Sequence, residues 1–146
     1  MRARSLLPIA VAAGLTLGAG AVAMQEDQGS IWDGVYTEAQ AQRGATLYSK
    51  GCAECHGEGL GGDDMNPPLL GSDFLWDWNG LSVGDLFDRI VISMPEGKPQ
   101  SMTPQEKADV LAFMLMQNEL PAGESELAAV SNNLRKHRID AVPPKK

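Results

Sequence analysis

Apolar residues recur at spacings of three and four along three stretches of the chain, the pattern of helices with one buried face. Each stretch opens with Ser or Thr followed three residues later by Gln, Asp or Glu, which is typical of a capped helix start. These signals predict helices over residues 37–48, 82–94 and 103–118. A weaker pattern at Leu127, Val130 and Leu134 allows a short further helix. Phe74, Trp76 and Trp78 alternate over too short a run to predict a strand, so the pattern indicates an all-α protein.

The first 23 residues have the composition of an export signal. Arg2 and Arg4 give a positive start, residues 6–22 are apolar, and Ala21-Val22-Ala23 fits the small-x-small cleavage pattern. We expect cleavage there, so that the mature chain begins at Met24 in the periplasm and has no membrane span. The alternative is an uncleaved anchor, for which the apolar run is short and is interrupted by a proline.

The rest of the chain divides into three parts by composition. Residues 24–36 are polar and predict a flexible leader, residues 37–120 hold the helical patterns and predict one small domain, and residues 121–146 form a C-terminal extension of mixed character. The formal net charge is −7, and loss of the two arginines of the signal makes the mature chain more negative. Such a surface repels nucleic acid and favours a partner with a basic patch.

Both cysteines and one of the two histidines stand in Cys52-Ala53-Glu54-Cys55-His56. C-x-x-C-H is the attachment signature of c-type haem, in which each thiol forms a thioether with the porphyrin and the histidine binds iron. Three other interpretations remain: a thioredoxin-like pair, which needs a βαβ setting; a zinc site, which needs more ligands; and a structural disulfide, which needs no histidine. The motif therefore predicts one covalently bound haem c, with Cys52, Cys55 and His56 as its protein partners.

A methionine is the natural candidate for the opposite side of the iron, because a thioether is a soft ligand. Met94 lies where a helix gives way to a loop containing two prolines and a glycine, which fix its position. Met102 lies in the same loop and competes with it. His137 is a further candidate in principle, although a solvated surface histidine is the simpler interpretation.

Two other stretches offer contacts to the cofactor. The segment Pro67-Pro68-Leu69 is stiffened by its prolines and offers a backbone carbonyl to the free imidazole N–H of His56, a bond that fixes the tautomer of a metal-bound histidine. Trp78 offers either a wall for the porphyrin or an indole N–H for a propionate, and ordinary packing is the alternative. Gly44 inside the first helix costs about 1 kcal/mol relative to Ala, and it is explained either by a close helix contact or by simple tolerance.

With these residues in place, the chain resembles the class I cytochrome c family over roughly residues 37–120. The resemblance implies an all-α cytochrome c fold, in which three to four helices wrap around one covalently bound haem. It implies contact between the first and last helices through Gly44, Tyr48, Val110 and Phe113. It also implies that the carbonyl to His56 comes from Pro67, that Leu69 completes the same haem-binding segment, and that the distal sulfur belongs to Met94 rather than Met102.

The chain more closely resembles small periplasmic cytochromes that accept electrons from quinoprotein-type dehydrogenases. This resemblance is carried by Trp78-Asn79-Gly80 and Pro121-Ala122-Gly123. It implies a non-enzymatic electron carrier between a dehydrogenase donor and an oxidase or cytochrome acceptor. Two alternatives stay open. In the first, the chain is a fixed haem subunit of a dehydrogenase or oxidase complex, for which the long C-terminal arm is suited. In the second, it is a haem sensor or peroxidase in which Met94 is displaced.

Overall fold

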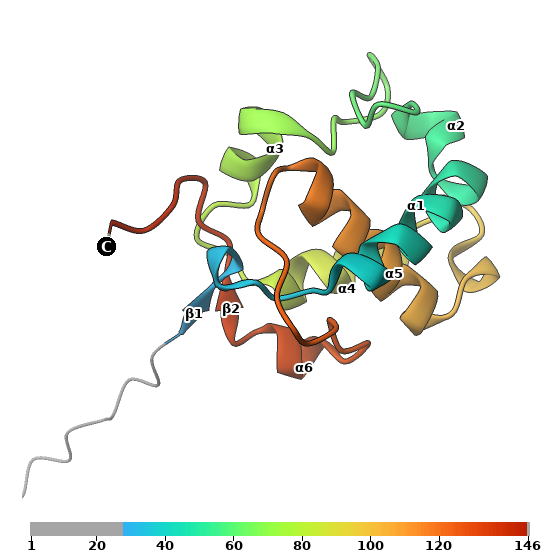
Figure 1. Cartoon of the computed structure of the whole chain (residues 1–146). Helices are drawn as coiled ribbons and strands as arrows, with labels where there is room; N and C mark the ends of the chain where they lie inside the picture. Colours follow the sequence, from blue (N-terminus) through green and yellow to red (C-terminus); the bar gives the residue numbers. More distant parts are fainter. Residues whose placement is uncertain (1–27, 146) are drawn as a thin grey trace, which may run out of the picture.

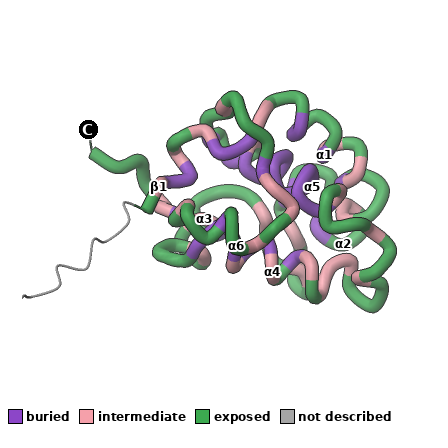
Figure 2. Tube along the Cα trace, turned by 90° about the horizontal axis from the view of Figure 1, so that it is seen from below, coloured by how far each residue is buried: buried purple, intermediate pink, exposed green. Residues whose placement is uncertain are grey.

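Two helices of equal length pack against each other at the centre of the molecule (Figure 1). They are α1 (Glu38–Gly51) and α5 (Pro104–Gln117), and they form the most extensive helix contact in the computed structural model, which describes residues 28–145. The predicted signal peptide, residues 1–23, lies outside the described residues. In Figure 2 the buried stretches gather where α1 and α5 meet.

Smaller elements surround this pair. The helices are α2 (Ala53–His56), α3 (Gly71–Asp77), α4 (Val83–Ser93), α6 (Ser131–Leu134) and the 3-10 turns η1 (Ile31–Asp33) and η2 (Pro99–Ser101). The strands β1 (Gly29–Ser30) and β2 (His137–Arg138) pair in parallel, with Gly29 opposite His137. The regular structure of the described residues is thus almost entirely helical. Within residues 28–145, no helix is long and apolar enough to cross a membrane.

The three predicted long helices are confirmed, and two of their caps are full capping boxes. Ser82 and Asp85 cap α4 reciprocally, and Thr103 and Glu106 do the same for α5. At α1 the Thr37 side chain accepts from the backbone of Gln40, but the Gln40 side chain does not return the bond. It is fully buried and reaches the C-terminal segment instead.

The contact between α1 and α5 is close enough to need a glycine. A Cβ atom added to Gly44 would lie 1.8 Å from the carbonyl oxygen of Asp109 and 3.0 Å from the Cβ of Phe113. One turn later, the rings of Tyr48 and Phe113 pack with centroids 5.3 Å apart. Gly44 is therefore a packing residue, as the resemblance to cytochromes c implied.

The two ends of the described chain pack on the domain and on each other. Gln40 donates to the carbonyl of Leu127 at 3.1 Å and accepts from its N–H at 2.7 Å. Ile139 is buried and exchanges backbone hydrogen bonds with Gly80 and Leu81. Of the stretch expected to be a flexible leader, residues 24–36, only residues 28–36 lie within the described chain, and there Ile31, on η1, is fully buried in the core. In this described part, Gly29 and Ser30 pair with His137 and Arg138, and such long-range pairing leaves no local pattern in the sequence.

Two short helices, α2 and α3, were not predicted. Residues 71–77 form α3, which buries Phe74 and leaves Trp76 59% exposed. The alternation of aromatic residues here reflects neither a strand nor a full amphipathic helix, because α3 is only two turns long.

Replacing Gly44 with Ala should force α1 and α5 apart at their closest point. We expect Gly44→Ala to lower the free energy of unfolding by about 1–3 kcal/mol or more, the usual cost of overpacking a core. The measurement is urea unfolding followed by circular dichroism. Gly51→Ala is the matched control in the same helix, since its added Cβ makes only ordinary contacts, to Met102 Sδ at 3.5 Å and Pro95 Cγ at 4.0 Å. Equal stabilities for the two variants would contradict the close contact.

Candidate functional site

The C-x-x-C-H motif begins where α1 ends. Cys52 caps α1 through its N–H to the Tyr48 carbonyl at 2.8 Å, and the chain then turns into the short helix α2. The N–H of His56 donates to the Cys52 carbonyl at 2.9 Å, so the motif makes a single helical turn. Both thiols are free, that of Cys52 half-buried and that of Cys55 exposed. One compact turn therefore presents two thiols and an imidazole.

Burial, together with the nearby Cys55, raises the pKa of the Cys52 thiol to about 11. Thioredoxin-like cysteines work through a lowered thiol pKa, because the thiolate is the attacking species. The environment of Cys52 therefore disfavours that chemistry. Within residues 28–145, no group of three or more His, Cys, Asp or Glu side chains is placed to hold a metal ion such as zinc.

The imidazole of His56 is buried and held from one side. Its Nδ1 lies 2.9 Å from the carbonyl oxygen of Pro67. Since a carbonyl only accepts, Nδ1 carries the proton and the lone pair stands on Nε2. This is the tautomer in which Nε2 is available to a metal.

A compact loop brings the Pro67 carbonyl to this position. The N–H of Gly62 donates to the His56 carbonyl at 2.9 Å, and Gly62 has a φ of +65°. A side chain there would meet the carbonyl oxygen of Asn66 at 2.3 Å, so the position requires glycine. The carboxylate of Asp63 then accepts the backbone N–H groups of Met65 and Asn66 at 2.8 Å.

Asn118, at the end of α5, fixes the segment that follows Pro67. Its side chain donates to the Leu69 carbonyl at 3.0 Å and accepts from the N–H of Gly71 at 2.9 Å. Leu69 itself is partly buried and packs on the core. Trp78 caps the C-terminus of α3 and is also partly buried. Sequence reasoning treated Asn118 only as a helix stop, and its two tertiary bonds have no sequence signal.

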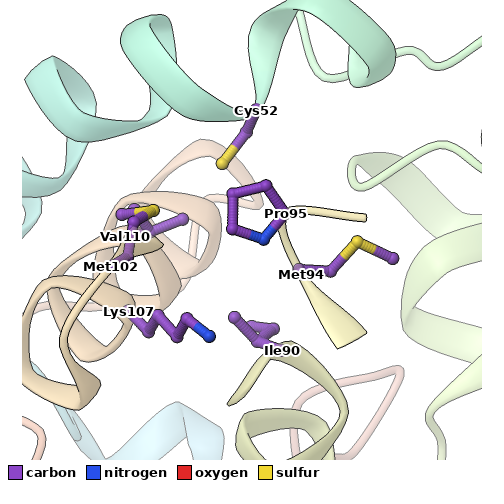
Figure 3. Close-up of a pocket in the computed structure, with 7 residues that line it drawn as sticks. All are labelled: Cys52, Ile90, Met94, Pro95, Met102, Lys107 and Val110. Carbon is purple, nitrogen blue, oxygen red and sulfur yellow. The ribbon is translucent and has the colours of Figure 1, made fainter. Parts of the chain in front are cut away.

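Met94 ends α4 and begins the loop that leads to η2. Its N–H still bonds to the Ile90 carbonyl, but its backbone is extended. Its side chain is half-buried and, in Figure 3, points away from Met102. Met102 Sδ lies against the C-terminal end of α1, 3.5 Å from a Cβ added to Gly51. Both methionines are partly buried against the core, but their side chains point in different directions (Figure 3).

A small pocket separates these two methionines (Figure 3). It is lined by residues from the end of α1, the end of α4, the following loop and α5: Cys52, Ile90, Met94, Pro95, Met102, Lys107 and Val110. Cys52 and Met94 thus share one pocket, whereas His56 is not among its lining residues. The predicted ligand pair His56 and Met94 comes from two separate segments at the same end of α1.

The comparisons with known proteins identify the class. The family model for subunit III of cbb3-type cytochrome c oxidase matches residues 39–114, which is more than half of the chain. The chain belongs to this family of class I c-type cytochromes.

Two relatives carry informative names. The cytochrome c subunit of the cytochrome bc1 complex from Corynebacterium efficiens is 27% identical over 108 residues, 70% of this chain. Thiosulfate dehydrogenase from Thiomonas intermedia is 37% identical over 78 residues, 49% of this chain. The chain spans 34% and 25% of the lengths of these relatives. Sulfane dehydrogenase SoxCD from Paracoccus pantotrophus aligns over 85% of this chain and 68% of its own, with a TM-score of 0.48 and 24% identity.

The residues of this cytochrome fit haem c, the group that the family binds. The fit rests on the two free thiols one turn apart and on a buried imidazole whose Nδ1 is already bonded to Pro67. His137 is not part of this arrangement. It lies on β2 beside Gly29, and its Nδ1 is buried with no hydrogen-bond partner among the described residues.

A hydrogen bond of Tyr48 connects α1 to the residue that follows the motif. The sequence did not indicate this bond. The Tyr48 hydroxyl donates to the Gly57 carbonyl at 2.7 Å, directly after His56. Burial, and to a lesser extent the charges of Cys52 and Glu58, raises the pKa of Tyr48 to about 12. The side chain is 1% exposed, so this phenol stays protonated well above the ordinary value of 10.0.

This pKa predicts a loss of stability at alkaline pH. Above pH 10 the unfolded phenol ionises while folded Tyr48 keeps its proton to about pH 12, so the unfolded state binds fewer protons. The free energy of unfolding should therefore fall with rising pH across this window, and it should fall less in Tyr48→Phe. Urea unfolding on either side of pH 10 measures both slopes. Identical slopes in the two proteins would rule out this role for Tyr48.

Proposed function

We propose that this protein is a periplasmic monohaem c-type cytochrome that carries one electron at a time from a donor dehydrogenase to a downstream acceptor. The observation that supports it most strongly is the hydrogen bond from His56 to Pro67, which leaves Nε2 with its lone pair available to iron at the motif that also holds both thiols. Export is supported by the apolar N-terminal segment with its small-x-small site.

The proposed roles follow from the positions of the side chains. Cys52 and Cys55 bind one haem covalently, His56 is the proximal ligand and Met94 is the distal ligand. Haem supplies one-electron exchange between Fe(III) and Fe(II). Pro67 orients His56 through its carbonyl, and Leu69 and Trp78 pack beside the cofactor. Two protein ligands leave no open position on the iron for a substrate, so the chain acts as a carrier.

The reduction potential would be set by the protein groups that surround the iron. The Pro67 carbonyl increases the electron-donating strength of His56, because it accepts a hydrogen bond from the Nδ1–H group. A thioether opposite histidine raises the potential. Burial of the site favours the iron state with the lower net charge.

The surface around the motif is acidic. Residues 52–88 contain no Lys or Arg. The segment from α2 to α3 exposes six carboxylates, those of Glu54, Glu58, Asp63, Asp64, Asp73 and Asp77. We propose that the redox partner presents a basic patch to this surface, because complementary charge steers association.

The second candidate function is a fixed haem subunit of a larger complex. One relative is named as a subunit of the cytochrome bc1 complex, and another is named as a dehydrogenase. The C-terminal segment, which would suit clasping a partner under this alternative, packs on its own chain through Leu127 and Gln40. Size-exclusion of the native extract separates the two: a free carrier elutes near its own mass.

Replacing Met94 tests the proposed ligand set. We expect Met94→Ala to lose the charge-transfer absorption of the sulfur–iron(III) bond, to lower the reduction potential and to bind CO rapidly when reduced, because a coordination position is opened. Met102→Ala is the matched control and should retain the wild-type spectrum. The ligand is Met102 if the two variants behave the other way round. Rapid CO binding by the wild-type protein would favour a sensor or peroxidase.

Charge complementarity predicts a salt effect on electron transfer. The second-order rate with a basic redox protein should fall steeply as ionic strength rises, because exposed charges are screened. Asp63→Asn together with Asp64→Asn should weaken this dependence, while Glu124→Gln, outside the acidic segment, should not. Stopped-flow absorbance of the haem band measures the rate. A rate that is independent of salt would contradict an acidic docking surface.

A further inference from the structure

Lys107 is a buried lysine without an acidic partner among the described residues. Only 2% of its surface is exposed, although it stands near the start of α5. Its Nζ donates to the carbonyl of Val91 at 2.9 Å and to the carbonyl of Pro99 at 2.6 Å. Burial lowers the pKa of this ammonium.

The two carbonyls stand at the two ends of one loop. Val91 lies in the last turn of α4, where carbonyls lack intrahelical partners, and Pro99 is the first residue of η2. Between them lie residues 92–98, which include Met94. A single side chain from α5 therefore joins the point where the loop begins to the point where it ends.

Stability alone does not explain a lysine at this position. Burying an ammonium group is costly, and an apolar side chain of similar size would fill the space without that cost. Lys107 also lines the pocket that contains Met94, Pro95 and Met102 (Figure 3). An apolar residue would pack there equally well, but it would leave both loop ends without a shared donor.

We propose that Lys107 is a positioning residue that closes the Met94 loop and thereby holds the thioether in place for ligation. The proposal rests on the proposed function, in which Met94 is the distal ligand. Lys107 does not touch the iron in this account. It sets the equilibrium between a closed loop, in which Met94 is positioned, and an open loop, in which it is not.

Binding of imidazole to the oxidised, haem-loaded protein measures this equilibrium. Added imidazole takes the distal position only when the loop is open, so its apparent dissociation constant is inversely proportional to the open fraction. Loss of the two hydrogen bonds of Lys107 should raise that fraction. We expect Lys107→Leu to bind imidazole about tenfold more tightly, which corresponds to about 1.4 kcal/mol. The sulfur–iron(III) absorption of this variant should also be lost at lower imidazole concentration.

Two controls separate positioning from a general loss of structure. Lys98→Leu removes an exposed lysine from the same loop and should bind imidazole as the wild type does. Lys107→Gln keeps a neutral donor and should give an intermediate affinity. If Lys107→Leu does not accumulate as haem-loaded protein, Lys107→Gln serves as the test in its place. Imidazole affinity equal to that of the wild type in Lys107→Gln would then overturn the proposal.

A double variant separates this proposal from the proposed function. In a Met94→Ala background no thioether competes, so Lys107→Leu should no longer change imidazole affinity. If Met94→Ala alone leaves the affinity unchanged, the proposed function fails. If Met94→Ala tightens binding but Lys107→Leu does not, Met94 is the ligand and Lys107 has no positioning role.

Discussion

The close crossing of α1 and α5 is the contact on which the rest of the structure depends. Gly44 lets the backbones meet at Asp109, and this contact brings the end of α1 beside the start of α5. The end of α1 carries Cys52, while the start of α5 carries Lys107, and both line the same pocket. One helix pair therefore determines where the haem motif and the methionine loop lie relative to each other.

From this pair, α5 holds the two segments that flank the proposed haem. Near its start, Lys107 bonds to both ends of the Met94 loop. At its end, Asn118 bonds to the segment that follows Pro67. Between these two points, burial acts to raise the pKa of Asp109, but hydrogen bonds from Arg43, Gln105 and Gln40 outweigh it. The pKa of Asp109 therefore lies below its ordinary value. The helix thus acts as a rigid support for segments that have little regular structure of their own.

Local signals predicted the helices, and the motif predicted the chemistry. The Ser82 and Thr103 caps are contained within four residues, so the sequence alone located two helix starts. Gly44 needed the family resemblance, because a glycine has no pattern that separates close packing from tolerance. The sequence did not single out Lys107, because its carbonyl partners, Val91 and Pro99, come from another segment. The packing of residues 127–139 had no local signal, since its bonds run to Gln40, Gly80 and Leu81.

The central claim is that Cys52 and Cys55 carry one haem, with His56 on one side of the iron and Met94 on the other. The most direct measurement is the intact mass of the exported protein under denaturing conditions, together with its absorption spectrum. The account predicts the mass of the mature polypeptide plus one haem, reduced to the bare polypeptide when both cysteines are replaced by Ala. A wild-type mass equal to the polypeptide alone, without Soret absorption, would contradict it.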